Sequence, residues 1–146
     1  MQPMAYRFIT LLALAGALGC AGSGVGPATS EGDPGPGPDV AGSYGAKTIM
    51  TTRDGIRTDQ IAAGVTLMLV LTERGTTSGQ LLVPTDAGGD GAPVDLTGIW
   101  ELEGDTVRFV QATETFVSRI PFLVSARQLA GEATVGGTVF EVVLTR

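Results

Sequence analysis

The amino-acid sequence predicts an all-β protein, an eight-stranded antiparallel up-and-down β-barrel over residues 40–146, after a signal peptide and a disordered linker. Two observations lead to this prediction. From Val40 onward, short runs of Thr, Val, Ile, Leu and Phe alternate with polar residues, and Gly, Asp and Pro separate the runs. No stretch repeats convincingly with the helical period. Sequential strands with short connections favour a meander that closes on itself.

The expected strands follow one another closely. A single helical turn is expected at 56–63, before Gly64. The eight strands are predicted at 43–52, 64–73, 76–83, 94–103, 106–112, 115–124, 127–135 and 138–145.

Two hairpins can be predicted to the residue. In the segment 101–108, Gly104 stands at the first central position of a two-residue turn, which suits type II′. That register pairs Glu101 with Arg108, Leu102 with Val107 and Trp100 with Phe109, so that apolar pairs share one face and opposite charges the other. The second hairpin has the three-residue loop 73–75. Its register places Leu67, Leu69 and Leu71 on the same face as Gly79, Leu81 and Val83.

The last strand indicates how the sheet ends. Residues 138–145 (TVFEVVLT) are apolar on both faces, and such a strand should be paired on both of its edges. Pairing with the first strand near Tyr44 would achieve this. A closed barrel is therefore expected in place of an open sheet or a sandwich.

Two short segments resemble a known family. The letters GSY at 42–44 and TGIWELEGDTVRF at 97–109 resemble the G-x-[WY] openings of lipocalin-like (calycin) domains. The resemblance covers about 107 residues, from Val40 to Arg146. It implies a small barrel that holds a ligand in its interior.

The first residues have the pattern of an export signal that ends in a lipidation site. One basic residue, Arg7, precedes an apolar run at 8–18 of about 16 Å as a helix, too short for a hydrocarbon core of about 30 Å. The letters ALGC at 17–20 resemble the bacterial lipobox, in which cleavage after Gly19 leaves Cys20 as a lipid-modified N-terminus. The alternative is an ordinary secretory signal, which would leave Cys20 as an unpaired thiol. We predict signal peptide removal at 1–19 and a palmitate-type acyl anchor on Cys20.

The segment after the cysteine is expected to be a tether. Residues 21–39 hold six Gly and four Pro and almost no side chain that could join a core, so 20–39 is predicted to be disordered. Ala21, and not Asp, follows the cysteine, which resembles lipoproteins that are sent to the outer membrane. The expected location is the cell envelope, at the outer membrane, facing the periplasm or the cell surface.

Composition argues against several classes of function. Arg7 is the only charged side chain before Cys20, so residues 20–146 carry 8 basic and 15 acidic groups, a net charge of −7. This charge and the lack of a basic cluster disfavour nucleic acid as a partner. The chain has no His, which removes the commonest general base and zinc ligand. No catalytic residue, cofactor or metal site is predicted.

Three groups of residues remain as candidates. The acidic loop 85–95 has the oxygen ligands that Ca²⁺ prefers but lacks a ligand spacing, so a solvated turn is favoured. Glu101, Glu103 and Asp105 lie on the outward face of a hairpin, where a solvated surface is favoured over acid–base chemistry. A third set either fills the barrel or lines a ligand pocket, with filling favoured: Tyr44, Leu69, Leu81, Trp100, Phe109, Phe122 and Phe140.

The expected function is non-enzymatic. The leading hypothesis is an envelope protein that is anchored to membrane lipid and binds a small apolar ligand in its barrel. The alternative is a filled barrel with a structural or interaction role, contacting an envelope protein through outward apolar residues such as Met68, Val70 and Leu82. Arg53, Arg57 and Arg74 are expected to be ordinary surface charges.

Overall fold

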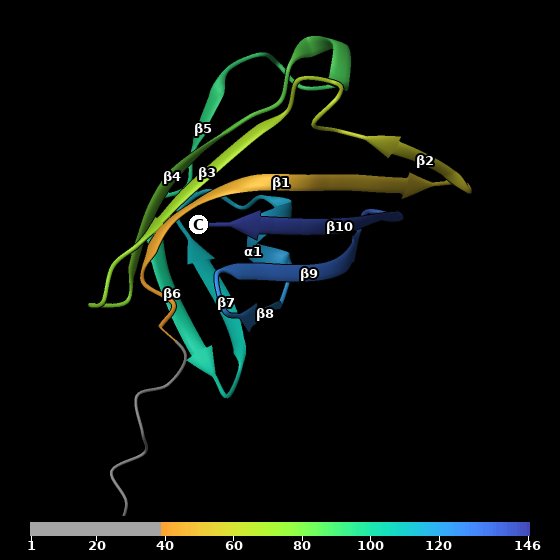
Figure 1. Ribbon diagram of the computed structural model, residues 1–146. Helices are drawn as coiled ribbons and strands as arrows, with labels where there is room; N and C mark the ends of the chain where they lie inside the picture. The colour runs from red at the N-terminus through yellow and green to blue at the C-terminus, as the bar shows by residue number, and fades with distance from the viewer. Residues whose placement is uncertain (1–38) are drawn as a thin grey trace, which may run out of the picture. The chain divides into compact units, whose positions relative to one another are not determined.

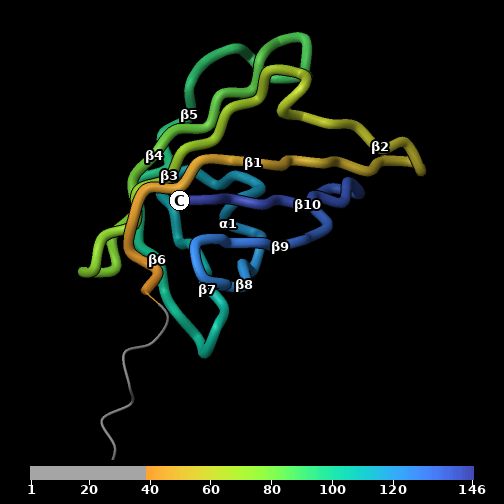
Figure 2. Tube along the Cα trace, viewed as in Figure 1, coloured from red at the N-terminus to blue at the C-terminus, as the bar shows by residue number. Residues whose placement is uncertain are grey.

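The computed structural model describes residues 39–146, which are almost entirely β-structure (Figure 1, Figure 2). The strands and helical turns follow in the order β1 (Gly42–Arg53), β2 (Ile56–Asp59), β3 (Thr66–Leu71), β4 (Thr76–Leu82), η1 (Thr85–Ala87), β5 (Pro93–Asp95), β6 (Gly98–Glu103), β7 (Thr106–Gln111), α1 (Phe116–Arg119), β8 (Phe122–Ser125), β9 (Gln128–Val135) and β10 (Thr138–Thr145).

The strands close into an eight-stranded antiparallel β-barrel, which confirms the predicted fold. Around the ring β1 pairs with β3, β3 with β4, β4 with β6, and each strand from β6 to β10 with the next, and β10 returns to pair with β1 from Gly45 opposite Thr145 to Thr52 opposite Val139. The segments β5 and β6 form one side of the barrel between them, since both pair with β4. The short β2 pairs with the end of β1 and extends it as a hairpin.

Both hairpin registers predicted from the sequence are confirmed. In β6–β7, Trp100 lies opposite Phe109, Glu101 opposite Arg108 and Leu102 opposite Val107, and Gly104 has the positive φ of 65° that its turn position requires. The loop of β3–β4 places Gly75 at φ 81°.

The β3–β4 register then aligns the inward residues as expected. Leu67 lies opposite Leu81, and Leu69 lies opposite Gly79. The indole Nε1 of Trp100 donates a hydrogen bond to the carbonyl oxygen of Thr72 (3.0 Å), which holds this loop against β6.

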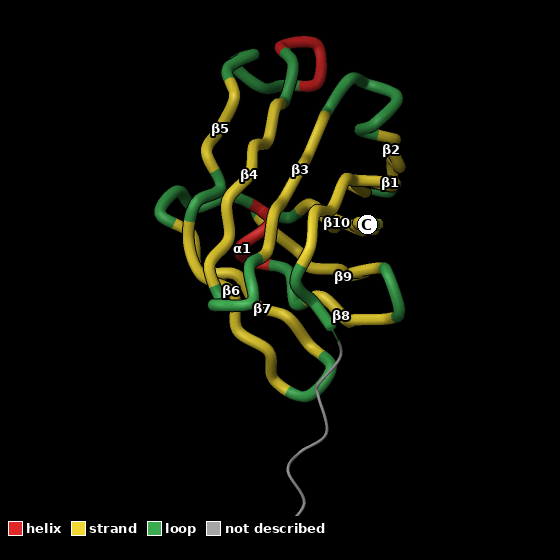
Figure 3. Tube along the Cα trace, turned by 60° about the vertical axis from the view of Figure 1, so that its left-hand side comes forward, coloured by secondary structure: helices red, strands yellow, loops and turns green. Residues whose placement is uncertain are grey.

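The strand predicted at 115–124 is wrong in its first half, where the chain forms the helical turn α1 (Figure 3). Thr115 caps the turn: its hydroxyl accepts from the amide of Val117, and the hydroxyl of Ser118 donates back to the carbonyl of Thr115. Val117 and Ile120 are fully buried under it. The apolar spacing of this segment was therefore helical, and the strand begins only after Pro121.

Two other boundaries also differ from the prediction. The expected strand 94–103 is interrupted at 96–97, where Asp95 Oδ1 accepts from the amide and hydroxyl of Thr97 while Leu96 turns fully into the core. The helical turn expected at 56–63 is instead strand β2, with a turn only after Asp59. There the amide of Gln60 donates to the carbonyl of Ile49.

One end of the barrel is closed by the two ends of the domain. The Tyr44 hydroxyl donates to the carbonyl oxygen of Val40 (2.9 Å), and the Arg146 guanidinium lies 5.9 Å from the centre of the Tyr44 ring. Arg146 also donates to the carboxylate of Asp39 (3.0 Å) and to the carbonyl of Ala41 (2.6 Å). Because every strand pairs within 42–145, the barrel carries its own core and is expected to fold without the residues before it.

Replacing Gly131 by alanine is expected to destabilise the barrel. A Cβ at Gly131 would lie 2.5 Å from the carbonyl oxygen of Pro121 and would overlap Ile120, so the chain between α1 and β8 would have to move. We expect a loss of about 1–3 kcal/mol in the free energy of unfolding, measured by urea denaturation. Gly45→Ala is the matched control, because nothing lies within 4 Å of a Cβ there; equal effects of the two substitutions would contradict this account.

Tyr44→Phe is expected to change both stability and its dependence on pH. Loss of the hydrogen bond to Val40 should cost about 1 kcal/mol at neutral pH. Burial raises the pKa of Tyr44 above its ordinary value of 10.0, opposed by nearby Arg146 and assisted by Asp39. The folded state thus favours the neutral phenol, and the resulting stability is complete below pH 10 and lost as the pH rises through the raised pKa.

The measurement is urea denaturation of both proteins from neutral to alkaline pH, followed by Trp100 fluorescence. The wild-type protein should lose stability more steeply than the variant above pH 10. Parallel curves would show that Tyr44 does not titrate differently in the two states.

Candidate functional site

A pocket opens at the end of the barrel opposite the Tyr44–Arg146 closure, with a volume of about 390 Å³. Strand direction fixes its place: β1 runs from the closed end at Gly42 to this open end at Arg53. The lining residues come from strands, loops and both helical turns: Ile49, Thr51, Arg53, Thr58, Gln60, Val65, Val83, Ala87, Phe116, Thr138 and Phe140.

The lining changes from apolar to polar toward the mouth. Ile49 and Val65 form the floor and are 1% and 3% exposed. Phe116 and Phe140 are half-buried above them, while Arg53 and Thr58 are exposed at the rim. A ligand would therefore find apolar surface inside and hydrogen-bonding groups outside.

One wall of the pocket is the inner face of β1 and its two neighbours. Across this wall Thr51 lies between Thr58 of β2 and Phe140 of β10, each directly opposite it. One step deeper, Ile49 is opposite Val142, which is buried in the core. One step outward, Arg53 is opposite Ile56.

This wall exists because β1 contains a β-bulge. The register shifts between Ala46 and Thr48, so Lys47 is an extra residue without a partner on β10. Tyr44 faces the core before the bulge, and Ile49 faces the core after it. Inward residues are thus even-numbered before Lys47 and odd-numbered after it, which turns Thr51 and Arg53 toward the pocket.

Phe140 on this wall also takes part in an aromatic stack. The rings of Phe116 and Phe140 are 4.7 Å apart between centres and tilted by 9°. The capped turn α1 positions Phe116, and burial of Val117 behind it fixes the turn against the core. Such stacking contributes about 0.5–1.5 kcal/mol beyond the buried area, so the wall is fixed before any ligand enters.

The polar groups of the pocket are partly paired with each other. Gln60 Nε2 donates to Thr51 Oγ1 (2.7 Å), which orients the amide along the wall. Within 39–146, Arg53 is the one charged residue that lines this pocket. Its Nε lies 4.0 Å from a carboxylate oxygen of Asp54, but the two side chains are 72% and 91% exposed, so the contact is a weak one in water.

The predicted set of lining or core residues divides three ways. Phe140 lines the pocket. Trp100 does not line the pocket: it is half-buried, packs against the core, and its indole nitrogen donates a hydrogen bond to the β3–β4 loop. The other five fill the barrel as buried core: Tyr44, Leu69, Leu81, Phe109 and Phe122.

Sequence reasoning missed most of the mouth. Arg53, expected to be an ordinary surface charge, lines the pocket, and so do Thr58, Gln60 and Phe116. The dipeptide Asp54-Gly55 was the available signal, since both residues have positive φ (51° and 78°), as a tight hairpin turn requires. Recognising that hairpin would have placed Thr58 opposite Thr51.

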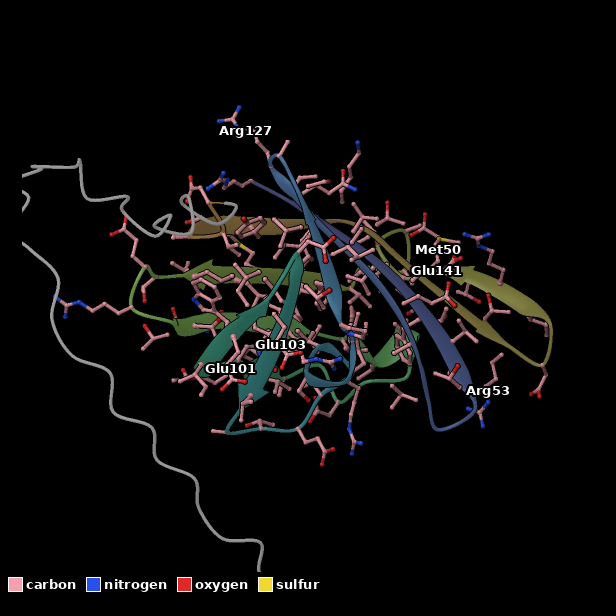
Figure 4. The ribbon with its side chains drawn as sticks, turned by 90° about the horizontal axis from the view of Figure 1, so that it is seen from below. Met50, Arg53, Glu101, Glu103, Arg127 and Glu141 are labelled. Carbon is pink, nitrogen blue, oxygen red and sulfur yellow. The ribbon has the colours of Figure 1, made fainter. Side chains whose placement is uncertain are left out.

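The acidic candidates lie on solvated surface. Glu101, Glu103 and Asp105 are exposed, and Glu103 contacts Arg108 at 3.4 Å. Figure 4 shows Glu101 and Glu103 on β6. In the loop 85–95, the carboxylate of Asp90 accepts from the amide of Ala92, and hydrogen bonds from Thr97 hold the pKa of Asp95 below its usual range. Among residues 39–146 no group of three or more acidic or cysteine side chains is placed to hold a metal ion.

The outer face carries the apolar residues that the sequence placed there. Met68 is 64% exposed and Val70 42%, while Leu82 is half-buried. Met68 and Leu82 line a second, outer hollow of about 450 Å³ that is bounded by Gly91 and Pro93.

The expected cleavage and lipidation residues, Gly19 and Cys20, lie outside the described residues. No helix within 39–146 has the length and apolar character needed to cross a membrane. Comparisons with protein-family models, with curated proteins and with solved structures give no match.

Proposed function

We propose that this protein is a membrane-anchored extracytoplasmic lipoprotein whose barrel binds a small, mainly apolar molecule without catalysing a reaction. The observation that carries the ligand-binding half is the open pocket of about 390 Å³. Pockets that hold small ligands begin at about 300 Å³ and are mostly apolar with a few polar groups. A barrel that served only as packed scaffold would have no need of such a space.

The chemistry of the lining supports binding and not catalysis. Of the described residues, those around the pocket include neither an acid nor a cysteine, and the chain contains no histidine. General acid–base catalysis would need such a group within reach of the substrate. Ile49, Val65 and the Phe116–Phe140 stack instead offer preformed apolar contacts.

The sequence supports the anchoring half of the proposal. A short apolar run ends at ALGC, and the following residues are rich in Gly and Pro up to Asp39. The barrel begins at its closed end, where Arg146 holds Asp39 and Ala41. A tether at this end would leave the mouth of the pocket unobstructed. An acyl chain contributes about 0.8 kcal/mol per buried CH₂, so two or more chains hold a protein stably.

A second candidate function rests on the outer face. Ile99 and Val110 lie opposite each other on β6 and β7 and are 45% and 56% exposed. Met68 and Val70 on β3 add further exposed apolar side chains on the outer side of the barrel. Exposed apolar surface of this kind favours contact with an envelope protein.

Binding can be tested with the neutral fluorescent probe N-phenyl-1-naphthylamine. The protein for this test is the soluble form, residues 20–146 with Cys20→Ser. We expect saturable fluorescence enhancement that Ala87→Trp abolishes, because Ala87 lines the pocket and an indole there would fill it. Ala92→Trp, in the exposed part of the same loop, should leave binding unchanged. Absence of saturable binding, or equal binding by both variants, would contradict a ligand site in the barrel.

Anchoring can be tested by metabolic labelling with an alkyne-bearing fatty acid in a bacterial host. The full chain should take up label and yield an N-terminal peptide that begins at a diacylglyceryl-modified Cys20. Cys20→Ser should abolish the label. An N-terminal peptide that still contains Met1, or a free thiol at Cys20 in the wild-type protein, would overturn the anchoring proposal.

A further inference from the structure

We propose that the ligand is an amphipath with a carboxylate-type anionic head, which Arg53 binds at the mouth while the apolar part lies between Phe116 and the pocket floor. This inference rests on the proposed ligand-binding function and specifies its chemical class. It arises from Arg53, the one charged side chain that residues 39–146 place on the pocket lining, and from the order of polarity along the wall.

The inner face of the β1–β2 hairpin places three polar groups in line toward the mouth. Gln60 lies at the level of Ile49, Thr58 lies opposite Thr51, and Arg53 comes last. The hydroxyl of Thr58 and the guanidinium of Arg53 both donate hydrogen bonds. An anion at the mouth would therefore meet donors, whereas the floor of Ile49 and Val65 has none to offer.

The terminal nitrogens of the Arg53 guanidinium are available to donate hydrogen bonds to such a ligand. Its contact with Asp54 is at 4.0 Å and involves Nε, and both side chains are largely in water. Asp54 occupies its place for a conformational reason, because its φ of 51° belongs to the tight turn with Gly55. Figure 4 shows Arg53 at the end of the molecule beyond Met50 and Glu141, far from Arg127 at the tip of the β8–β9 turn.

Arg57 and Glu141, which lie on the neighbouring strands, are paired with each other and do not compete for this role. Arg57 points to the outer face of the hairpin, where it binds the carboxylate of Glu141 (2.5 Å). Glu141 lies opposite Met50 on the same outer face. The alternation of the hairpin places Arg53 and Arg57 on opposite faces, and the bulge at Lys47 makes the face of Arg53 the inner one.

Ile56 gives independent support for an apolar segment beside the charge. It is directly opposite Arg53 and is 71% exposed, the highest value among the exposed large apolar residues of 39–146. Ile56 does not line the pocket but adds exposed apolar surface beside the guanidinium at the rim. Guanidinium groups bind carboxylates with two parallel hydrogen bonds, which favours this head group.

The test compares two probes of equal chain length, decanoate and decanol, which displace N-phenyl-1-naphthylamine from the soluble form. Arg53→Gln should lower the binding affinity for decanoate by about two- to fivefold, as expected for an exposed ion pair. The binding affinity for decanol should not change. The loss for decanoate should shrink at high salt, because exposed charges are screened. Arg74→Gln is the matched control: it removes the same charge from the β3–β4 loop at the far end of the barrel.

Each result bears on one claim. Equal weakening of both probes by Arg53→Gln would make Arg53 a structural part of the wall and overturn the inference. If Arg53→Gln and Arg74→Gln weaken the binding of decanoate equally, the effect is one of net charge, and this result would also overturn the inference. If N-phenyl-1-naphthylamine still binds saturably in either case, the proposed ligand-binding function stands and only the anionic head group is ruled out. If N-phenyl-1-naphthylamine does not bind at all, the proposed function itself is contradicted.

Discussion

The pocket depends on one irregularity in β1, the bulge at Lys47. An antiparallel strand presents alternate residues to the core, and one extra residue reverses that alternation for everything after it. Tyr44 can therefore close one end of the barrel while Thr51 and Arg53, at odd positions, face the interior at the other end. A regular β1 would have placed Arg53 outside and turned the face of Thr52 and Arg57 toward the pocket.

Around this strand the barrel has a closed half and an open half. In the closed half, Leu69, Phe109 and Phe122 fill the interior, and Phe109 and Phe122 meet edge to face with ring centres 5.6 Å apart. In the open half, the β1–β2 hairpin continues past the ring, and α1 enters from the other side. The pocket is the space between this hairpin and α1, which the side chains of the barrel strands do not fill.

The fold could be read from the sequence because local chemistry and periodicity agreed. Gly104 and Gly75 specify their turns, and the apolar residues of β6 and β7 specify one register. The pocket could not be read in the same way, because two of its determinants break the period. The bulge at Lys47 makes the face of Arg53 unpredictable by counting, and the Thr115 cap makes a helix of a segment whose composition suits a strand. Phe140 was identified because β10 alternates regularly, and Trp100 packs against the core opposite Phe109, with its indole nitrogen hydrogen-bonded to the β3–β4 loop.

The position of Asp39 also has a mechanical consequence. Any pull transmitted through the residues before it acts first on the bonds of Arg146 and then along the axis of β1. β1 is joined to β3 from Gly42 to Gly45 and to β10 from Gly45 to Thr52, so the load would be resisted in shear by two successive rows of hydrogen bonds. Such a load would be taken up there, and the geometry around Phe116 and Phe140, at the other end of β1, would be left undisturbed.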